Sequence, residues 1–471
     1  MKPVVYCSER EWNVRSCWQS AVLWANKMNT PICDFVETYI KNNTLRLHMP
    51  GHKGISLLGF EQADITEIAG ADSLYEADGI IAESEMNASE LFGCRTVYST
   101  EGSSQCIRAM LYLVQLYAEA GGRKPVIAAG RNVHKAFLSA AALLDFEVQW
   151  LYPKESSSYL SCCLTSEDLE KYFAEAVVKP DAVYLTSPDY LGRIADISAL
   201  ADVCHRNGVL LIVDNAHGAY LRFLPESLHP IDLGADMCCD SAHKTLPALT
   251  GAAYLHLSEK MEAVVGAQVK DALALFGSTS PAYLILQSLD AVNRYLKEYP
   301  HRLSAFLCEM QTLKDALSQH GYSLYGEEPL KITIDAAAFG YTGFELAGFL
   351  RKANIEPEFS DRDYLVLMLT PELSADALRY LECVLCKIPQ KTVLQTHAPV
   401  FTRCERVLSI RKAMFSKSET LPVEQCLGRT LAVSTVGCPP AVPILVCGEK
   451  ITEHVIECFK YYGVKACCVV K

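Results

Sequence analysis

Short apolar runs alternate with helical patterns between about residues 95 and 260. Between the runs, apolar residues such as Ile107, Met110 and Val114 recur at helical spacing. Strands separated by helices favour an α/β fold with a mainly parallel, doubly wound sheet. Any ligand of such a sheet is expected at its strand ends. The predicted strands are 126–129, 148–151, 182–186, 209–213, 237–239 and 252–256.

The pattern changes after residue 260, where a long helical region leads to a smaller C-terminal α+β part. Residues 331–334 and 364–369 read as its strands. Near the N-terminus, Val14, Cys17 and Trp18 fall at helical spacing and predict an amphipathic leader helix. We expect four units: a leader at 1–30, a major domain at 31–300, a small α+β domain at 301–390 and a C-terminal domain at 391–471.

Composition narrows the class of protein. Half of the 471 residues are hydrophobic, and no stretch approaches the ~20 apolar residues of a membrane span. The net charge of -12 argues against nucleic acid as a partner, because phosphate backbones select basic surfaces. The sequence lacks a signal peptide, so we expect a cytoplasmic protein that binds no membrane.

The 20 cysteines do not indicate a disulfide scaffold. Adjacent pairs such as Cys162 with Cys163 rarely bridge each other, which favours buried thiols in a reducing compartment. Cys383 and Cys386 form one C-x-x-C without a second pair, in a segment with a helical pattern. We therefore expect no metal.

Two common ligands of doubly wound sheets lack their motifs here. No G-x-G-x-x-G follows a strand, and no G-x-x-x-x-G-K-[ST] occurs. Nicotinamide and ATP are therefore disfavoured.

Lysines follow histidines at Lys53, Lys135 and Lys244, and one of them could carry pyridoxal 5′-phosphate (PLP) as a Schiff base. A PLP enzyme of this type also needs a carboxylate against the pyridine nitrogen, so that the ring accepts electrons. Asp214 ends the run 209–213, and Lys244 follows the next predicted strand. Two groups at the ends of neighbouring strands can contact opposite sides of one planar ring. Of the three lysines, only Lys244 lies at a strand end next to one that carries a carboxylate.

Several motifs in this order resemble those of the ornithine/lysine/arginine decarboxylases, PLP enzymes of the aspartate-aminotransferase fold (fold type I). The resemblance runs from about Thr30 to residue 300 and resumes weakly from about residue 400. Its motifs are HMPGHKG (His48–Gly54), RNVHKA (Arg131–Ala136), LTSPDYLG (Leu185–Gly192), DNAHG (Asp214–Gly218), DSAHKTLPAL (Asp240–Leu249), GSTSPAY (Gly277–Tyr283) and PPAVPILVCGEKIT (Pro439–Thr452).

The resemblance implies roles for the residues in these motifs. Lys244 would hold PLP as a Schiff base, and Asp214 would pair with the pyridine nitrogen. His217 would lie beside the ring's phenolic oxygen or the substrate, and His134 would stack on the ring. Lys244, His217 and His134 are thus the expected catalytic residues. Asn215 departs from the family, which commonly has Glu there, and leaves the role of that carboxylate in doubt.

The phosphate of PLP would be bound by serines. Ser103 and Ser104 open a predicted helix whose N-terminal amides suit a dianion. Ser241 and His243, which flank Lys244, would complete the phosphate and ring contacts. The alternative is purely local: the two serines could cap their helix, and His134 could make a hydrogen bond at a helix start.

A basic amino acid is the substrate that the resemblance implies, with loss of carbon dioxide. Its cationic side chain needs an acidic partner, for which Glu67, Glu358 and Asp361 are candidates, although each could be a solvated charge. A PLP aminotransferase or lyase of the same fold is the alternative function, and a non-enzymatic PLP-binding protein is the next.

A homodimer, or a higher homo-oligomer, with shared active sites is the expected assembly. The HMPGHKG and GSTSPAY segments flank the core without belonging to its strands, and in the resembling family they border the partner's site. We therefore expect His52 to contact substrate and Thr279 to contact the cofactor across the interface. The alternative is that both segments are ordinary surface turns.

Overall fold

The computed structural model describes residues 28–119, 122, 124–152, 158–395, 399, 403–434 and 442–471. The predicted leader helix at 1–30 lies almost wholly outside these residues. No helix within the described ranges is long and apolar enough to cross a membrane.

A seven-stranded sheet forms the centre of the larger part, in the order β1-β7-β6-β5-β4-β2-β3. Strands β2 to β6 run parallel, whereas β7 is antiparallel to both β6 and β1. Its strands are β1 (Arg95–Ser99), β2 (Val126–Gly130), β3 (Glu147–Leu151), β4 (Ala182–Thr186), β5 (Leu210–Asp214), β6 (Met237–Asp240) and β7 (Ala253–Leu257).

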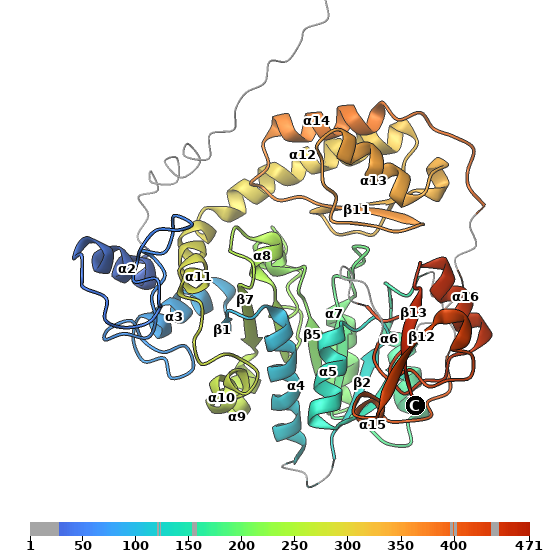
Figure 1. The fold of residues 1–471 in the computed structure, drawn as a ribbon, viewed down its shortest axis with the longest axis horizontal. Coiled ribbons are helices and arrows are strands. Elements are labelled where there is room, and N and C mark those ends of the chain that lie inside the picture. The colour runs from blue at the N-terminus through green and yellow to red at the C-terminus, as the bar shows by residue number, and fades with distance from the viewer. Residues whose placement is uncertain are drawn as a thin grey trace, which may run out of the picture.

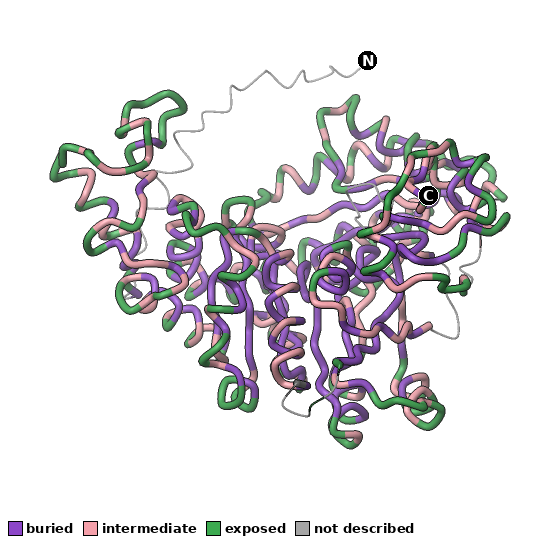
Figure 2. The backbone as a smooth tube through the Cα atoms, turned by 60° about the horizontal axis from the view of Figure 1, so that its bottom comes forward, coloured by how far each residue is buried: buried purple, intermediate pink, exposed green. Residues whose placement is uncertain are grey.

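Helices cover both faces of this sheet, which explains why its inner strands β2, β4 and β5 are mostly apolar. Along β5, Leu210 and Ile212 pack with α4 and α5, whereas Leu211 and Val213 pack with α7. Figure 2 shows buried residues along the strands and exposed ones in the outer loops. The helices around this part are α2 (Pro31–Lys41), α3 (Ile80–Phe92), α4 (Ser103–Glu119), α5 (Lys135–Leu144), α6 (Ser166–Glu175), α7 (Ile197–Arg206), α8 (Ala242–Thr245), α9 (Glu259–Val265), α10 (Val269–Ala274) and α11 (Tyr283–Leu296).

A four-stranded antiparallel sheet makes up a smaller part, in the order β10-β11-β9-β8. The long helix α12 (Tyr299–His320) connects the two parts, and the small sheet with its helices lies above the large one in Figure 1. Its elements are β8 (Ser323–Tyr325), β9 (Lys331–Asp335), α13 (Gly343–Lys352), β10 (Phe359–Ser360), β11 (Tyr364–Met368) and α14 (Ala375–Cys386).

The C-terminal segment folds beside the outer strands of the large sheet (Figure 1). A buried ion pair joins the two, with Arg131 Nη2 3.1 Å from Glu449 Oε2. Arg131 follows β2 directly and precedes α5, so this pair links the C-terminal segment to the strand end that leads to His134. Its elements are α15 (Ile410–Met414), β12 (Ser418–Pro422), α16 (Glu453–Tyr461) and β13 (Ala466–Val470).

The predicted strands all occur, and each of their ends differs from the prediction by no more than one residue. The boundaries of the four expected units stay predictions.

Candidate functional site

Asp214 and Lys244 lie at the carboxyl ends of adjacent parallel strands. Asp214 is the last residue of β5 and pairs in register with Cys239 of β6. The strand β6 is followed at once by α8, the short helix that carries Lys244. The order of the strands therefore brings Asp214 and Lys244 to the same edge of the sheet, as the sequence predicted.

Asp214 is buried, with 2% of its surface exposed. The hydroxyl of Tyr184 donates to its Oδ2 at 3.1 Å, and the amide of Ala216 donates to its Oδ1 at 3.2 Å. Burial raises the pKa of Asp214, and the Lys244 ammonium opposes this rise. A cationic group against Asp214 would therefore stabilise its ionised form.

The pKa of the Lys244 side chain is shifted in the opposite direction to that of Asp214. Burial lowers its pKa, the Asp214 carboxylate opposes that effect, and a second cation at Lys331 adds to it. Its Nζ makes no hydrogen bond or ion pair with any residue in the described ranges. A lysine amine whose pKa is lowered, and whose Nζ has no hydrogen-bond partner among the described residues, is suited to act as a nucleophile.

Two histidines lie close enough to Lys244 for its charge to lower their pKa values. His134 is the N-cap of α5, where its Nδ1 accepts the Ala136 amide at 3.1 Å; burial and then Lys244 lower its pKa to about 3. His217 is buried, and burial followed by the Lys244 and Lys331 charges holds its pKa well below the ordinary value. Both rings are therefore neutral near pH 7.

Ser103 and Ser241 meet at the N-terminus of α4. Ser241 Oγ donates to Ser103 Oγ at 2.9 Å, and both residues are buried. Ser104 is the second residue of the same helix and is half-buried. The Nδ1 of His243 donates a 2.9 Å hydrogen bond to the carbonyl oxygen of Ala252. Hydroxyls at a long helix's N-terminus form a donor set that suits a phosphate.

The other predicted residues are placed differently. Glu358 is exposed and accepts a 2.8 Å hydrogen bond from Tyr190, whose ring packs against His217, and its charge raises the pKa of Lys244. Glu67 is exposed and accepts from Ser73 Oγ at 2.7 Å. His52 pairs with Asp64 at 3.2 Å. No hydrogen bond or ion pair in the described part of the chain joins Glu67 or His52 to Lys244.

Thr279 is exposed on this chain. The preceding residue, Ser278, donates its amide to Glu101 Oε1 at 3.3 Å. The GSTSPAY loop therefore contacts the segment that leads into α4.

Sequence reasoning missed Lys331 and Glu328, which form a buried ion pair of 2.6 Å. Lys331 begins β9 in the small sheet, yet its charge acts on both Lys244 and His217. The available signal was a lysine at the head of an apolar strand, three residues after a glutamate.

Asn215, the departure from the family pattern, pairs with a carboxylate instead of supplying one. Its Nδ2 donates to Asp240 Oδ1 at 2.7 Å, and Asp240 also accepts from His229 and His256. The turn around Asn215 is tight, because a Cβ at Gly218 would lie 2.0 Å from Asn215 Oδ1. This bond joins the residue after Asp214 to the end of the strand that leads to Lys244.

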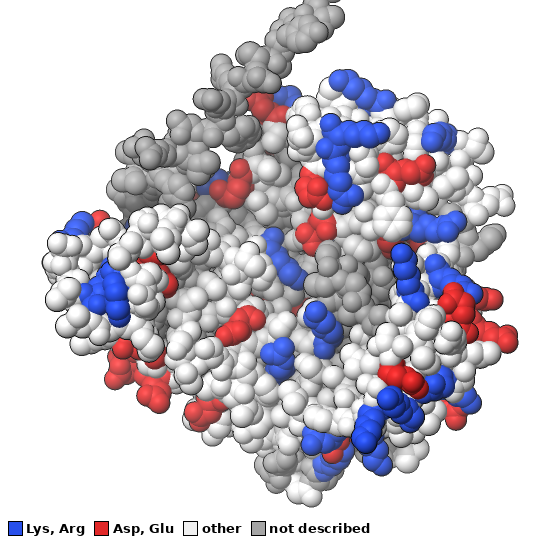
Figure 3. Space-filling view, in the orientation of Figure 1, with Lys and Arg blue, Asp and Glu red and all other residues white. Residues whose placement is uncertain are grey.

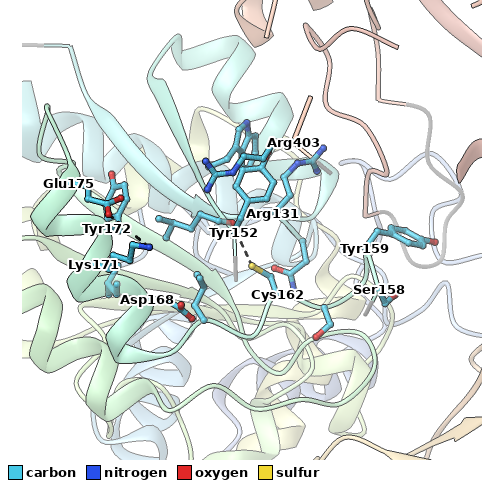
Figure 4. Close-up of a pocket in the computed structure, with 16 residues that line it drawn as sticks. Arg131, Tyr152, Ser158, Tyr159, Cys162, Asp168, Lys171, Tyr172, Glu175 and Arg403 are labelled. Atoms are coloured by element: carbon cyan, nitrogen blue, oxygen red, sulfur yellow. Dashed lines mark hydrogen bonds and ion pairs between the residues drawn. The ribbon is translucent and has the colours of Figure 1, made fainter. Parts of the chain in front are cut away.

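A pocket of about 450 Å³ lies elsewhere, beside the end of β3 and helix α6. Figure 4 shows Arg131, Tyr152 and Arg403 together on one side of it, and the Arg403 guanidinium stacks over the Tyr152 ring at 4.6 Å. None of its lining residues belongs to the Lys244 cluster, so this pocket is separate from the site described above.

The residues around Lys244 fit PLP. Asp214 offers a buried carboxylate for a pyridinium, Lys244 an amine without a partner among the described residues, and Ser103 with Ser241 hydroxyls for a phosphate.

Family profiles match most of the chain. The profile described as "Orn/Lys/Arg decarboxylase, major domain" matches residues 30–322. The one described as "Orn/Lys/Arg decarboxylase, C-terminal domain" matches residues 395–466.

Relatives match along nearly the whole length. The "Uncharacterized protein YaaO" of Bacillus subtilis is 30% identical over 467 residues, which cover 91% of this chain and 93% of that protein. An arginine decarboxylase of Halalkalibacterium halodurans is 29% identical over 464 residues, which cover 90% and 91%.

Solved structures share the fold at lower identity. The Francisella novicida lysine decarboxylase superposes with a TM-score of 0.77 at 17% identity, over 97% of this chain and 83% of that one. The Escherichia coli constitutive lysine decarboxylase gives 0.72 at 18%, over 94% and 82%. The expected fold class, fold type I with a smaller C-terminal part, is confirmed.

Proposed function

The chain belongs to the Orn/Lys/Arg decarboxylase family and is an amino-acid decarboxylase, and from that premise we propose that it binds PLP on Lys244 and decarboxylates lysine, arginine or ornithine. The observation that carries this proposal is the pairing of buried Asp214 with Lys244 at adjacent strand ends.

In the proposed site, three groups of residues would contact three different parts of the cofactor. Lys244 would hold it covalently, Asp214 would face its ring nitrogen, and Ser103 with Ser241 would bind its phosphate, aided by Ser104 and His243. When bound, PLP supplies an electron sink for the pair that departing carbon dioxide leaves behind. Asp214 would keep a proton on the ring nitrogen, because a buried carboxylate is stabilised by an adjacent cation.

The remaining residues would act on the substrate. The bond between the α-carbon and the carboxyl carbon breaks, carbon dioxide leaves, and the α-carbon takes up a proton to give the amine. Neutral His134 and His217 would lie beside the reacting groups without repelling a cationic substrate. Glu358 would attract the substrate's basic side chain, since its carboxylate is exposed and is hydrogen-bonded to Tyr190, which packs against His217.

Arginine is the first substrate to test, because curated relatives that match about nine-tenths of the chain are named arginine decarboxylases. The experiment measures released carbon dioxide and amine from arginine, lysine and ornithine. We expect amine from one of the three, and none with a Lys244→Ala control. A keto acid in place of the amine would favour the aminotransferase alternative, and PLP binding without turnover would favour a non-enzymatic protein.

We also propose a homodimer, or a larger assembly built from it. Large apolar side chains are exposed along residues 45–60, among them Leu47 at 85% and Leu57 at 81%. In Figure 3, the lobe that carries α2 presents mostly uncharged atoms. A second copy of the chain would cover this surface, and its Thr279 and His52 would reach the first copy's site.

A further inference from the structure

A second lysine, which is fully buried, approaches the site from the small sheet. Lys331 is the first residue of β9, and only 1% of its side-chain surface is exposed. Its Nζ lies 2.6 Å from Glu328 Oε2, 3.0 Å from His217 Nδ1 and 3.2 Å from the carbonyl oxygen of Asp189. This lysine therefore joins the small sheet to the loop that follows β5.

The Lys331 Nζ makes two hydrogen bonds, to Asp189 and His217, and an ion pair with Glu328. A lysine ammonium has three N–H donors and no lone pair to accept with. Glu328 supplies a carboxylate oxygen, Asp189 a carbonyl oxygen, and His217 a ring nitrogen. Because the ammonium only donates, His217 Nδ1 must be the acceptor in this contact.

The state of the His217 ring follows from that contact. A neutral imidazole carries one proton, so a ring that accepts at Nδ1 has its N–H at Nε2. A doubly protonated ring would place two cations 3.0 Å apart in a buried position. The Tyr190 ring packs edge-on against the imidazole, with 5.3 Å between centroids, and limits its rotation.

We propose that Lys331 is a positioning residue that fixes His217 in its Nε2–H tautomer by donating to Nδ1, with Glu328 as the counter-ion of Lys331. His217 then presents a hydrogen-bond donor to the PLP oxygen or the substrate carboxylate beside it. The role of this donor toward PLP or substrate rests on the proposed function. The tautomer does not, because it follows from the contact between Lys331 and His217.

The direct test is nitrogen NMR of full-length holoenzyme with ¹⁵N-labelled histidine rings, with the His217 signals assigned from a His217→Gln protein. We expect wild-type His217 to carry its proton on Nε2. The Lys331→Met/Glu328→Gln protein, which loses both charges together and so avoids a lone buried carboxylate, should show a mixture of tautomers. Glu328→Gln alone retains the Nζ donor and should keep the wild-type tautomer.

A kinetic cycle provides the second readout. Replacing Lys331 and Glu328 together should lower kcat/KM by about tenfold or more, whereas the same change in a His217→Gln background should cost much less. A wild-type proton on Nδ1, an unchanged tautomer in the Lys331→Met/Glu328→Gln protein, or equal losses in both backgrounds would overturn the proposal. A correct tautomer in a protein that releases no amine would instead count against the proposed function alone.

Discussion

Lys244 differs from the other two lysines that follow a histidine. Lys53 and Lys135 are exposed, whereas Lys244 is half-buried and has the Asp214 carboxylate close by. We expect Lys244→Ala to lose both the visible absorption of bound PLP and activity. The exposed lysines should not replace it, because an amine in water is a poorer nucleophile than one held in a buried site. Lys135→Ala is the matched control and should keep the absorption. A colourless Lys135→Ala protein beside a coloured Lys244→Ala protein would reverse the assignment.

Asp214 should matter for turnover more than for cofactor binding. We expect Asp214→Asn to bind PLP and to lose more than ~100-fold in kcat, since a neutral amide cannot hold the ring proton. Tyr184→Phe removes only the hydrogen bond to Oδ2 and should cost far less. Steady-state kinetics with equal PLP content distinguish the two, and near-normal turnover of Asp214→Asn would contradict the role.

Asp189 gives a prediction on stability and pH. Burial raises its pKa from 3.8 to about 6, although Ser161 and the amides of Leu191 and Arg193 donate to it. The folded state therefore holds a proton that the unfolded chain releases, so this group's contribution to stability falls as the pH rises through that window.

Asp189→Asn removes this dependence. The Tm of wild type minus that of the variant should fall between pH 3.8 and about 6, as measured by calorimetry. The exposed Asp202→Asn on α7 serves as the control and should follow wild type. A constant difference between wild type and Asp189→Asn would show that Asp189 does not titrate there.

At the scale of elements, the bond between Asn215 and Asp240 holds the ends of β5 and β6 together. We expect Asn215→Ala to lower the free energy of unfolding by about 1–3 kcal/mol, because a buried carboxylate oxygen loses its donor. Asn215→Asp should cost more than Asn215→Ala, since it sets two carboxylates side by side. Denaturant titration would check the order, and the reverse order would mean that the carboxylate pair shares a proton.

Periodicity predicted the inner strands of the large sheet, because β2, β4 and β5 are buried on both faces and are apolar along nearly their whole length. It missed β1, whose five residues RTVYS mix polar and apolar side chains and pair only with antiparallel β7. The same limit applies to the site. Motif order located Asp214 and Lys244, but the contact between Lys331 and His217 joins residues 114 positions apart, and no local pattern encodes it.

At the scale of the whole molecule, the exposed apolar surface along residues 45–60 makes the assembly testable. Mixing Lys244→Ala with Thr279→Ala or His52→Ala protein should restore part of the activity, because some hybrid dimers would contain one intact composite site. Light scattering would establish the dimer, and kinetics of the mixture would establish the sharing. A fully active monomer, or hybrids without rescue despite confirmed subunit exchange, would rule out shared sites.

The ion pair between Arg131 and Glu449 also has a consequence for synthesis on the ribosome. Glu449 is made 318 residues after Arg131, which takes roughly 15–60 s at typical elongation rates. Throughout that interval, the nascent sheet holds an arginine beside β2 whose carboxylate partner has not been translated. A buried cation without its anion is costly, so the strand end that leads to His134 should settle only after translation has passed Glu449.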